Sequence, residues 1–571
     1  MRIARKLLAI SGGLMLAIPA GSAVGTTSSA EEPAFQTGDI EHVANIPFGG
    51  SDIEFATREV TKLSNGATGD PVCQKDASGA CQVDAAGNVI YETEVRDFAV
   101  AGGYPSSSGG ARIIDITDPR NPVVAGITPC AISQNDIQIQ GDLLLVASDG
   151  NGTCKKPDGG NQPFAGTALL NFSDPRSPTY ISHLQYSRGS HNHTFVPGKP
   201  IVYLSDSDVA NAALGNIPIW DISDPANPVM KFEFKFGAHS PHDITFNADG
   251  TRAYVAAVSL TYILNTENPI NPTLVSVIPN EGVSISHQAD PTPDGDYLLV
   301  SDELGGGAAG VSPGGPIHVY DIRNEARPVK VGIIENDCVQ QTCQSAPDVP
   351  VATSHVFRIN PDGYTMAIAW YKDGLGVVDF SSIRGANVAG TGTTSKFGAR
   401  VIGWITMPNA NTWSAKMWME RHPGYVFTND IRRGFDVFYV ASMGPGYLAR
   451  GTIDGGHPAN FSQDNGVTRQ EFTSDCEYTP QTNGVDGWVT KIPAGLADGK
   501  NTLHAKAIGG SPAPYDLDIY FFDKDCVLVG AEEPADTDTM GLIPEGTEYA
   551  MVTNYAPGPP ISLDLSTQFT P

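Results

Sequence analysis

Residues 218–228 read Pro-Ile-Trp-Asp-Ile-Ser-Asp-Pro-Ala-Asn-Pro, and close variants of this stretch recur along the chain. Each copy has a short apolar run, an Asp or Asn that we call the anchor, and a turn closed by proline. Other copies lie at 112–122, 168–178, 262–272 and 317–328, and a degenerate sixth opens at 377–380. Val and Ile favour a strand, and proline ends it because its φ is fixed and it has no N–H to donate. The repeat therefore predicts strand, turn, strand.

The anchors recur every 44 to 58 residues, at Asp115, Asn171, Asp221, Asn265, Asp321 and Asp379. That period fits one four-stranded blade of a β-propeller. Asp-Gly hairpin turns, such as the one at 249–250, supply the other strand connections. Inner strands are expected to begin at seven places, near Ser51, Gln134, His191, His242, His287, His355 and Lys416.

The last unit, ending at 435–440, has no outer strand after it. Residues 41–46, Glu-His-Val-Ala-Asn-Ile, have the pattern of the missing strand and precede the first inner strand. We predict that this N-terminal strand completes the seventh blade, which closes the ring and removes an exposed edge. The expected fold is all-β, with a seven-bladed β-propeller over residues 40–442.

The blade core resembles the LVIVD-repeat proteins, which are secreted bacterial β-propellers, over about residues 40–442. The Asp-Pro-x-x-Pro turns carry this resemblance, and the sixth and seventh copies depart from the pattern. The resemblance implies a fold and no particular activity.

The propeller repeat ends at the linker Ser442-Met443-Gly444-Pro445-Gly446, and residues 447–571 have a different pattern. Alternating strand-like segments at 489–492, 502–507, 515–522 and 549–554 predict one β-sandwich domain. The segment 515–522 and the later Thr553-Asn554-Tyr555 resemble strands of bacterial pre-peptidase C-terminal (PPC) domains. This resemblance implies an accessory module of a secreted protein that binds a surface or a polysaccharide.

Residues 1–30 have the pattern of a secretory signal peptide, with basic residues, a short apolar run and then small residues. No stretch is long enough to cross a bilayer, so we expect a secreted, extracellular protein without a membrane span. Eight cysteines agree with export. Proximity alone suggests the pairs Cys73–Cys81, Cys130–Cys154, Cys338–Cys343 and Cys476–Cys526, since connectivity cannot be read from sequence.

The 571 residues include 63 acidic and 35 basic ones, a formal net charge of −28. Such a field disfavours nucleic acid and favours cations or neutral ligands. The expected partner is a small-molecule, glycan or protein ligand at the mouth of the propeller channel. The chain has no glycine-rich dinucleotide fingerprint, phosphate-binding loop or His-Glu-x-x-His zinc motif. The sequence leaves the oligomeric state open.

Four successive inner strands carry histidine in one register, counted from the hairpin glycines: His191, His242, His287 and His355. Inner strands line the channel of a propeller, so these residues should form a row at one mouth. His193 and His239 lie near two of them. Because neutral imidazole is the commonest metal ligand, we predict a site for a transition metal ion, copper, zinc or iron, built from these six residues. Lys416 is expected in the same register. Three acidic segments end strands after the hairpin turns and could reach a ligand in the channel: Asp206-Ser207-Asp208, Asp302-Glu303 and Asn429-Asp430.

The alternative is that each histidine bonds to a neighbouring blade and needs no ligand. Two functions therefore remain open. The first is a secreted metal-binding propeller that carries out redox or other metal-dependent chemistry. The second is a non-catalytic extracellular binding or adhesion protein that recognises a partner or glycan. Whether the chain is an enzyme is open, and no catalytic residue can be named.

Overall fold

The computed structural model describes residues 30–104, 110–132, 134, 136–186, 189–205, 215–235, 240–279, 282–303, 315–335, 352–381, 383, 400–453, 488–492, 496–497, 499–508, 517–532, 538–554 and 561–569. The described elements are β-strands, together with a 3-10 turn at Ala441–Met443. The expectation of an all-β protein is confirmed for these residues. Among them no helix is long and apolar enough to cross a bilayer. The predicted signal peptide falls outside them up to residue 29.

Seven antiparallel sheets follow one another between Phe35 and Tyr439 in the described part of the chain. We number them in chain order. The first holds β3 (Gly50–Thr61), β4 (Thr93–Gly103), β5 (Arg112–Asp115) and β6 (Val123–Ile127). The second holds β7 (Cys130–Ala131), β8 (Ile137–Gln140), β9 (Leu143–Lys155), β10 (Asn161–Asn171) and β11 (Thr179–Gln185). The third holds β12 (Asn192–Phe195), β13 (Ile201–Ser205), β14 (Asn216–Asp221) and β15 (Val229–Lys235). The fourth holds β16 (Asp243–Phe246), β17 (Arg252–Ala257), β18 (Leu260–Asn265) and β19 (Thr273–Pro279).

The remaining three sheets follow the same order. The fifth holds β20 (Ser286–Pro291), β21 (Tyr297–Asp302), β22 (Ile317–Asp321) and β23 (Val329–Ile334). The sixth holds β24 (Phe357–Ile359), β25 (Thr365–Ala369), β26 (Leu375–Asp379), β27 (Arg400–Thr406) and the N-terminal β1 (Phe35–Gly38). The seventh holds β28 (Thr412–Met417), β29 (Tyr425–Asp430), β30 (Gly434–Tyr439) and β2 (Glu41–Ile46).

The anchor residues explain why the repeat requires Asp or Asn. The side-chain oxygen of each anchor accepts the backbone N–H two residues further on, at 2.9 to 3.0 Å. This Asx turn ends the third strand and starts the turn to the fourth. The sequence did not reveal a second shared feature. A β-bulge lies just before every anchor, for example between Ile219 and Trp220, and it increases the local twist.

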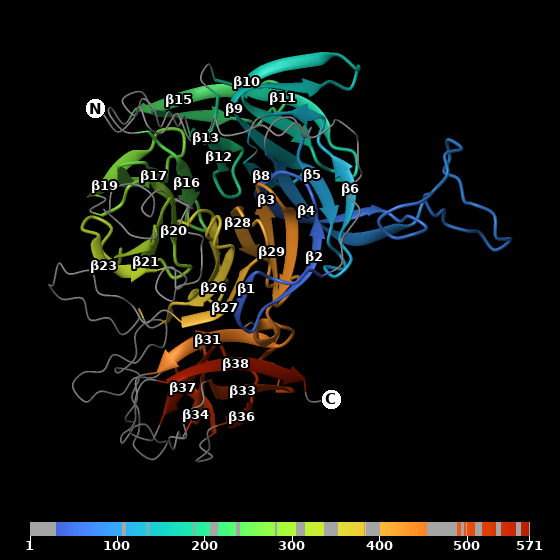
Figure 1. Ribbon diagram of the computed structural model, residues 1–571. Coiled ribbons are helices and arrows are strands. Elements are labelled where there is room, and N and C mark those ends of the chain that lie inside the picture. Colours follow the sequence, from blue (N-terminus) through green and yellow to red (C-terminus); the bar gives the residue numbers. More distant parts are fainter. Residues whose placement is uncertain are drawn as a thin grey trace.

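The first strands of neighbouring sheets lie against one another around a common centre (Figure 1). The described contacts join β3 to β8, β8 to β12, β12 to β16, β16 to β20, β24 to β28, and β28 back to β3. The amide of Gln288 in β20 donates to the carbonyl of Phe357 in β24 at 2.9 Å. Antiparallel sheets packed radially in this way make a β-propeller, whose first strands line the centre.

Two N-terminal strands add to sheets formed by much later residues. β2 pairs with β30, with Glu41 opposite Tyr439 and Ile46 opposite Phe435. This is the pairing that the pattern of residues 41–46 predicts. β1 pairs with β27 and was not foreseen. Between β3 and β4, a hairpin extension projects away from the sheets (Figure 1).

The C-terminal region forms two more four-stranded antiparallel sheets. One holds β31 (Tyr447–Ile453), β38 (Ile561–Phe569), β33 (Asn501–Ile508) and β36 (Asp538–Leu542). The other holds β32 (Trp488–Lys491), β37 (Tyr549–Asn554), β34 (Leu517–Phe522) and β35 (Leu528–Glu532). One hydrophobic core contains side chains from both sheets, such as Leu503 and Leu565 from the first and Ile519 and Val552 from the second.

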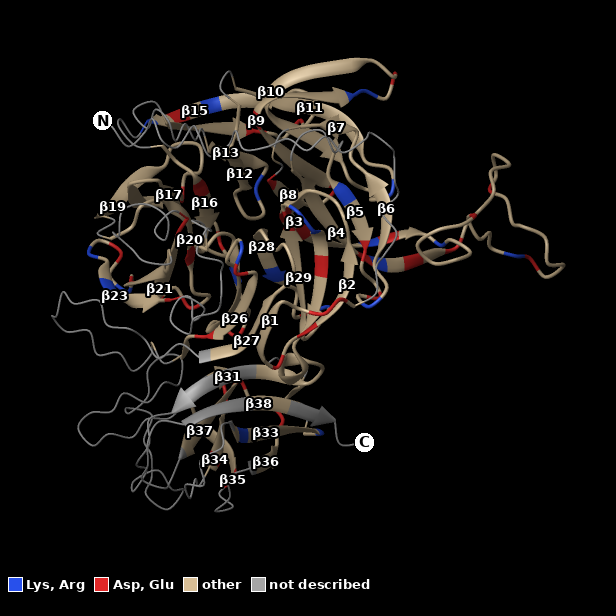
Figure 2. Ribbon diagram, in the orientation of Figure 1, with Lys and Arg blue, Asp and Glu red and all other residues tan. Residues whose placement is uncertain are grey.

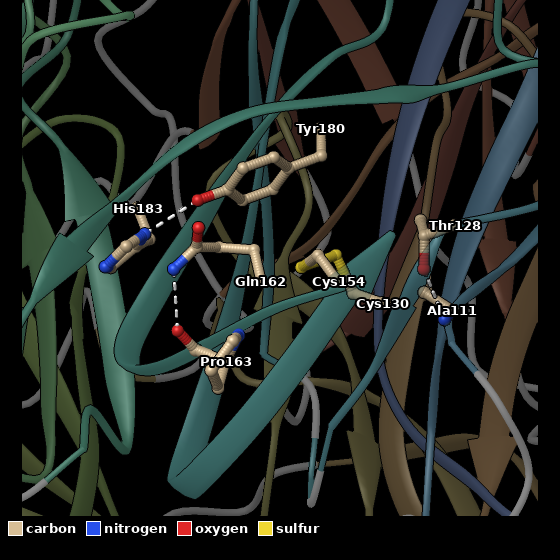
Figure 3. The surroundings of a disulfide bond; sticks show 8 residues. All are labelled: Ala111, Thr128, Cys130, Cys154, Gln162, Pro163, Tyr180 and His183. Atoms are coloured by element: carbon tan, nitrogen blue, oxygen red, sulfur yellow. Dashed lines mark hydrogen bonds between the residues drawn. A yellow bond between two sulfur atoms is a disulfide. The ribbon is translucent and has the colours of Figure 1, made fainter. Parts of the chain in front are cut away.

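Two of the four predicted disulfides are present. Cys130 and Cys154 join β7 to β9 within a core shared by the first and second sheets (Figure 3). Cys73 and Cys81 join two neighbouring segments within the projecting extension, which also pair at Lys75 and Cys81. Cys338, Cys343 and Cys476 lie outside the described residues, so the structure does not show the partners of the other two predicted pairs.

Candidate metal centre

The four predicted histidines lie side by side at the centre of the propeller. His287 is the second residue of β20, and the other three lie just before β12, β16 and β24. The ring centroids of His191 and His242 are 4.1 Å apart, those of His242 and His287 4.4 Å, and those of His287 and His355 3.9 Å. The register predicted from the hairpin turns therefore brings all four rings together. We call these four residues the histidine row.

The row continues into aromatic residues. The rings of His355 and Trp413 are 4.3 Å apart, and Trp413 in turn stacks on Tyr104 at 5.5 Å. The count from the hairpin glycines predicted Lys416 at this position of the seventh sheet. The residue found there is Trp413, in β28. The count fails because the turn before Gly424 is longer: β28 ends at Met417 and β29 begins at Tyr425, whereas β16 ends at Phe246 and β17 begins at Arg252.

The four histidines line a cavity of about 260 Å³ at the centre of the sheets. The inner strands also supply acidic and basic side chains to its wall, among them Asp52, Asp136, Asp243, Asp290 and Lys416. Acidic residues on β3, β16 and β20 are visible around the centre in Figure 2. The cavity is therefore polar along its walls, with the imidazoles grouped on one part of them.

His355 is held in one orientation by the protein. Its Nδ1 lies 2.6 Å from the carbonyl oxygen of Trp413. A carbonyl only accepts, so Nδ1 carries the proton and Nε2 keeps its lone pair. Nε2 is buried without a hydrogen-bond partner among the described residues and lies 3.8 Å from Oε1 of Glu303. Fixing the tautomer through the far nitrogen is how proteins present imidazole to a metal.

Glu303 faces three of the four histidines. Its Oε2 is 3.7 Å from Nε2 of His242, and its Oε1 accepts a hydrogen bond from the hydroxyl of Tyr371 at 2.8 Å. Potential ligand atoms of His242, His287 and Glu303 all lie within 4.8 Å of one another. In the described part of the chain, no other set of three such residues meets that spacing. Tyr371 fixes the carboxylate on the side away from His242.

Burial keeps these imidazoles neutral. Desolvation lowers the pKa of His355 to about 3, partly opposed by the bond to Trp413. Desolvation and the neighbouring histidines hold the pKa of His242 and of His287 well below the ordinary value. The Nδ1 atoms of both have no hydrogen-bond partner among the described residues. Neutral imidazole with a free lone pair is the form that binds metal.

His191, at the end of the row, has different surroundings. Its Nδ1 lies 2.7 Å from Oδ1 of Asp149 and 3.4 Å from the side-chain amide of Gln134. Burial lowers its pKa, but Asp149 and then Asp136 outweigh that effect and raise it to about 10. In this state His191 is a cation paired with Asp149. A metal would have to displace its proton, which makes it the least ready ligand of the four.

The other two predicted ligands do not join the row in the described structure. His193 is fully buried, with its Nδ1 3.2 Å from the hydroxyl of Thr167 in the second sheet, and desolvation lowers its pKa to about 3. This is the contact between sheets that the structural alternative predicts. His239 lies outside the described residues. The sequence did contain evidence that His193 is structural. When the inner strands are aligned with one another, His193 falls at the position of Ile53 and Ile244, which are buried.

The arrangement brings two neutral imidazoles, those of His242 and His287, together with the carboxylate of Glu303, and places a third, that of His355, 3.8 Å from the same carboxylate. Imidazole suits zinc, copper and iron, and a carboxylate beside it does not exclude any of them. The sequence singled out the histidines but gave Glu303 no priority over the other strand-end acids. Asp302 and Asp430, two of those acids, accept backbone N–H groups in turns instead.

No protein-family model and no curated protein matches the chain. Solved structures with similar folds exist. A protein from Lactobacillus plantarum is 11% identical, with a TM-score of 0.40, covering 66% of this chain and 89% of that one. The Myceliophteria thermophila Cps50 (Swd1) β-propeller domain is 12% identical, with a TM-score of 0.40, covering 60% and 93%. A hypothetical selenium-binding protein from Sulfolobus tokodaii is 14% identical, with a TM-score of 0.37, covering 55% and 78%. Similarities of this extent say nothing about what this chain does.

Proposed function

We propose that the chain is a secreted seven-bladed β-propeller whose channel holds one transition metal ion. Each of the seven sheets is one blade, and β2 closes the ring by pairing with β30. The two C-terminal sheets form a β-sandwich around their shared core. The resemblances to LVIVD-repeat and PPC domains support this division, as do the two disulfides, which suit an oxidising compartment.

The metal ligands in this proposal are His242, His287, His355 and Glu303. The observation that carries it is the set of buried imidazole nitrogens that have no hydrogen-bond partner and converge near one carboxylate. Leaving a buried polar atom unpaired costs about 1–3 kcal/mol. Purely structural histidines would not repeat this cost at the same point of successive blades. A bound ion removes it by taking the lone pairs.

The chain's own residues would set the reactivity of such an ion. Trp413 orients His355 through its carbonyl, and Tyr371 orients Glu303 through its hydroxyl. The aromatic rings of Trp413 and Tyr104 cover one flank of the row and limit water there. Copper or iron would support redox chemistry at this point, and zinc would polarise a bound substrate or water. A small molecule in the cavity is the substrate class that fits.

The test is metal analysis of the purified full-length exported protein. After reconstitution with copper, zinc and iron in turn, we expect one equivalent of one of them to remain on gel filtration. His287→Ala should lose at least nine-tenths of it and stay folded. His183→Ala is the control, because His183 lies in β11, away from the row, and bonds to the hydroxyl of Tyr180 (Figure 3). Full occupancy in His287→Ala would overturn the metal site.

A non-catalytic binding protein remains the second candidate, because one further observation favours it. The hairpin that projects from the first sheet carries exposed apolar side chains, Val83, Val89 and Tyr91, and is closed by Cys73–Cys81. Such a rigid apolar arm suits contact with another molecule. Absence of any bound metal after reconstitution would favour this function over the first.

A further inference from the structure

The wall of the cavity carries a second group of side chains besides the histidine row. The inner strands place seven charged residues there: Asp52, Glu54, Asp136, Asp243, Asp290, Arg358 and Lys416. Five are acidic and two are basic, so the described wall has an excess of carboxylates. Charges held away from water are stable only when each finds a partner, so the pairing of each one matters.

Three of the five acids are accounted for by protein partners. Glu54 lies 2.7 Å from the guanidinium of Arg358 and 3.6 Å from Nζ of Lys416. Asp52 lies 3.0 Å from the same Nζ. Asp290 accepts hydrogen bonds from the hydroxyl of Thr245 at 2.6 Å and from the amide of Gln288 at 2.8 Å. Both cations of the wall are thereby used.

Asp136 and Asp243 remain; Asp243 has two neutral donors, as Asp290 has, and Asp136 has none among the described residues. Neither lies within ion-pair distance of a lysine or arginine in the described part of the chain. Asp243 accepts one amide N–H from Asn192 at 2.7 Å and its neighbour's backbone N–H at 2.6 Å. Asp136 is only 7% exposed, lines the cavity, and its carboxylate has no hydrogen-bond donor among the described residues. Asp136 interacts electrostatically with His191, whose Nδ1 already bonds to Asp149.

We propose that the cavity binds a small organic cation, an amine whose ammonium group sits between the carboxylates of Asp136 and Asp243. An ammonium ion has three donors and one positive charge, which match Asp136, a carboxylate without a described donor, and Asp243, a carboxylate without a described lysine or arginine partner. A cavity of about 260 Å³ fits a molecule of a few heavy atoms rather than a drug-sized ligand. The strongly acidic chain also concentrates cations near its surface.

A bare metal ion is a poorer match for this second site. In the described residues, the set of ligand atoms close enough to share one ion is that of His242, His287 and Glu303, and the wall acids are not among them. An organic cation needs no such convergence, because its N–H groups point in several directions. Since Asp243 directly follows His242 and both line the cavity, the rest of the amine would lie toward the histidine row. The position of the rest of the amine rests on the proposed metal function. The binding of its ammonium group by Asp136 and Asp243 does not.

The experiment is calorimetric titration of the full-length protein, freed of metal with a chelator. Butylammonium chloride is the probe, and 1-butanol is its neutral counterpart of nearly the same shape. We expect saturable binding of butylammonium with one site and at least tenfold weaker binding, or none, of 1-butanol. Equal affinity for the two would overturn the proposal, and so would failure of butylammonium to bind.

Variants locate the site. Asp136→Asn and Asp243→Asn should each weaken butylammonium binding at least tenfold. Asp158→Asn, an exposed turn acid on the β9–β10 hairpin, should leave it within twofold. Unchanged affinity in both cavity variants would overturn the proposal. If either variant fails to fold, the comparison of the two probes on the wild-type protein still decides. Because all titrations use metal-free protein, their outcome is independent of the metal content that tests the proposed function.

Discussion

Histidine side chains are buried both in the histidine row and in the seam, by which we mean the contact between β2 and β30. The two regions differ in whether the ring nitrogens have hydrogen-bond partners. In the seam, Nδ1 of His42 accepts the backbone N–H of Glu31 at 2.9 Å, so Nε2 carries the proton that it donates to Asp436, also at 2.9 Å. Arg433 and Asn45 complete the bonds to that carboxylate. In the row, by contrast, ring nitrogens of His242, His287 and His355 have no described partner. The seam is satisfied by the protein itself, whereas the row leaves nitrogen lone pairs that a ligand can take up.

The largest effect should come from removing the seam altogether. Deleting residues 31–47 removes β1 and β2 and leaves β27 and β30 each with an unpaired edge. We expect the truncated protein to aggregate or to melt much lower than the intact chain in differential scanning calorimetry with size-exclusion chromatography. Unchanged unfolding would contradict the closed seven-bladed ring.

His42→Ala should lower the free energy of unfolding by about 1–3 kcal/mol beyond its lost packing, because it takes one hydrogen-bond donor away from the buried carboxylate of Asp436. Its metal content should stay unchanged. The matched variant in the row, His287→Ala, should cost less than His42→Ala, since both lose the packing of a buried ring but the Nδ1 of His287 has no described bond to lose. Denaturant titration of the two metal-free variants measures both. The reverse order of stability would make the row structural.

Glu303→Gln should weaken metal affinity by about 10–100-fold, because the amide keeps the shape but not the charge. Tyr371→Phe, which removes the bond that orients this carboxylate, should have a smaller effect in the same direction. Competition with a chelator of known affinity gives both values. Wild-type affinity in Glu303→Gln would remove this residue from the ligand set while leaving the histidines in place.

The smallest effect concerns pH. Solvated imidazoles would lose metal as the pH falls through about 6.5. Burial lowers the pKa of His355 to about 3 and that of His242 and His287 well below 6.5, so the neutral binding form persists to lower pH. Metal affinity should therefore change less than tenfold between pH 7.5 and 5.5.

The metal-free protein should behave differently over the same range. The unfolded chain protonates His242, His287 and His355 near pH 6.5 and the folded one does not, so each of them lowers the free energy of unfolding as the pH drops below 6.5. The raised pKa values of His191 and Asp243 act in the opposite direction, so the contribution of one imidazole is measured by comparing the wild type with His287→Ala in denaturant titrations at pH 7.5 and 5.5. The same pH dependence in both proteins would show that the His287 imidazole is solvated in the folded protein.

The features that follow from periodicity could be predicted from sequence. The repeat of anchors and turns predicted the strands, and the count from Gly250 and Gly295 predicted that His242 and His287 would meet. The same count misplaced Lys416, because one longer turn shifts a residue to another place along the inner strand, where it pairs with Asp52 and Glu54. The repeat predicts which residues share a position within a strand. It does not predict how long each turn is.

The sequence could not predict which side chains from neighbouring sheets would lie close together. Glu303 and Asp149 each reach a histidine of the following sheet, at 3.8 Å and 2.7 Å. Nothing in their local sequence separates them from acids such as Asp302, which end strands and hold turns. Which of these carboxylates faces the channel depends on how neighbouring sheets pack, and that packing is a property of the whole ring.

The pairing of β2 with β30 also has a consequence for how the molecule comes into being. His42 and Asp436 are 394 residues apart, so the ring cannot be completed until nearly the whole propeller has been made. In a chain that crosses a membrane unfolded, β2 would therefore reach the far side before β30, the strand with which it pairs. Loop-closure entropy grows only with the logarithm of length, so this late closure costs roughly 2 kcal/mol more than pairing within one blade. The hydrogen bond from His42 to Asp436, which Arg433 also contacts, forms only on closure, so it acts against that cost.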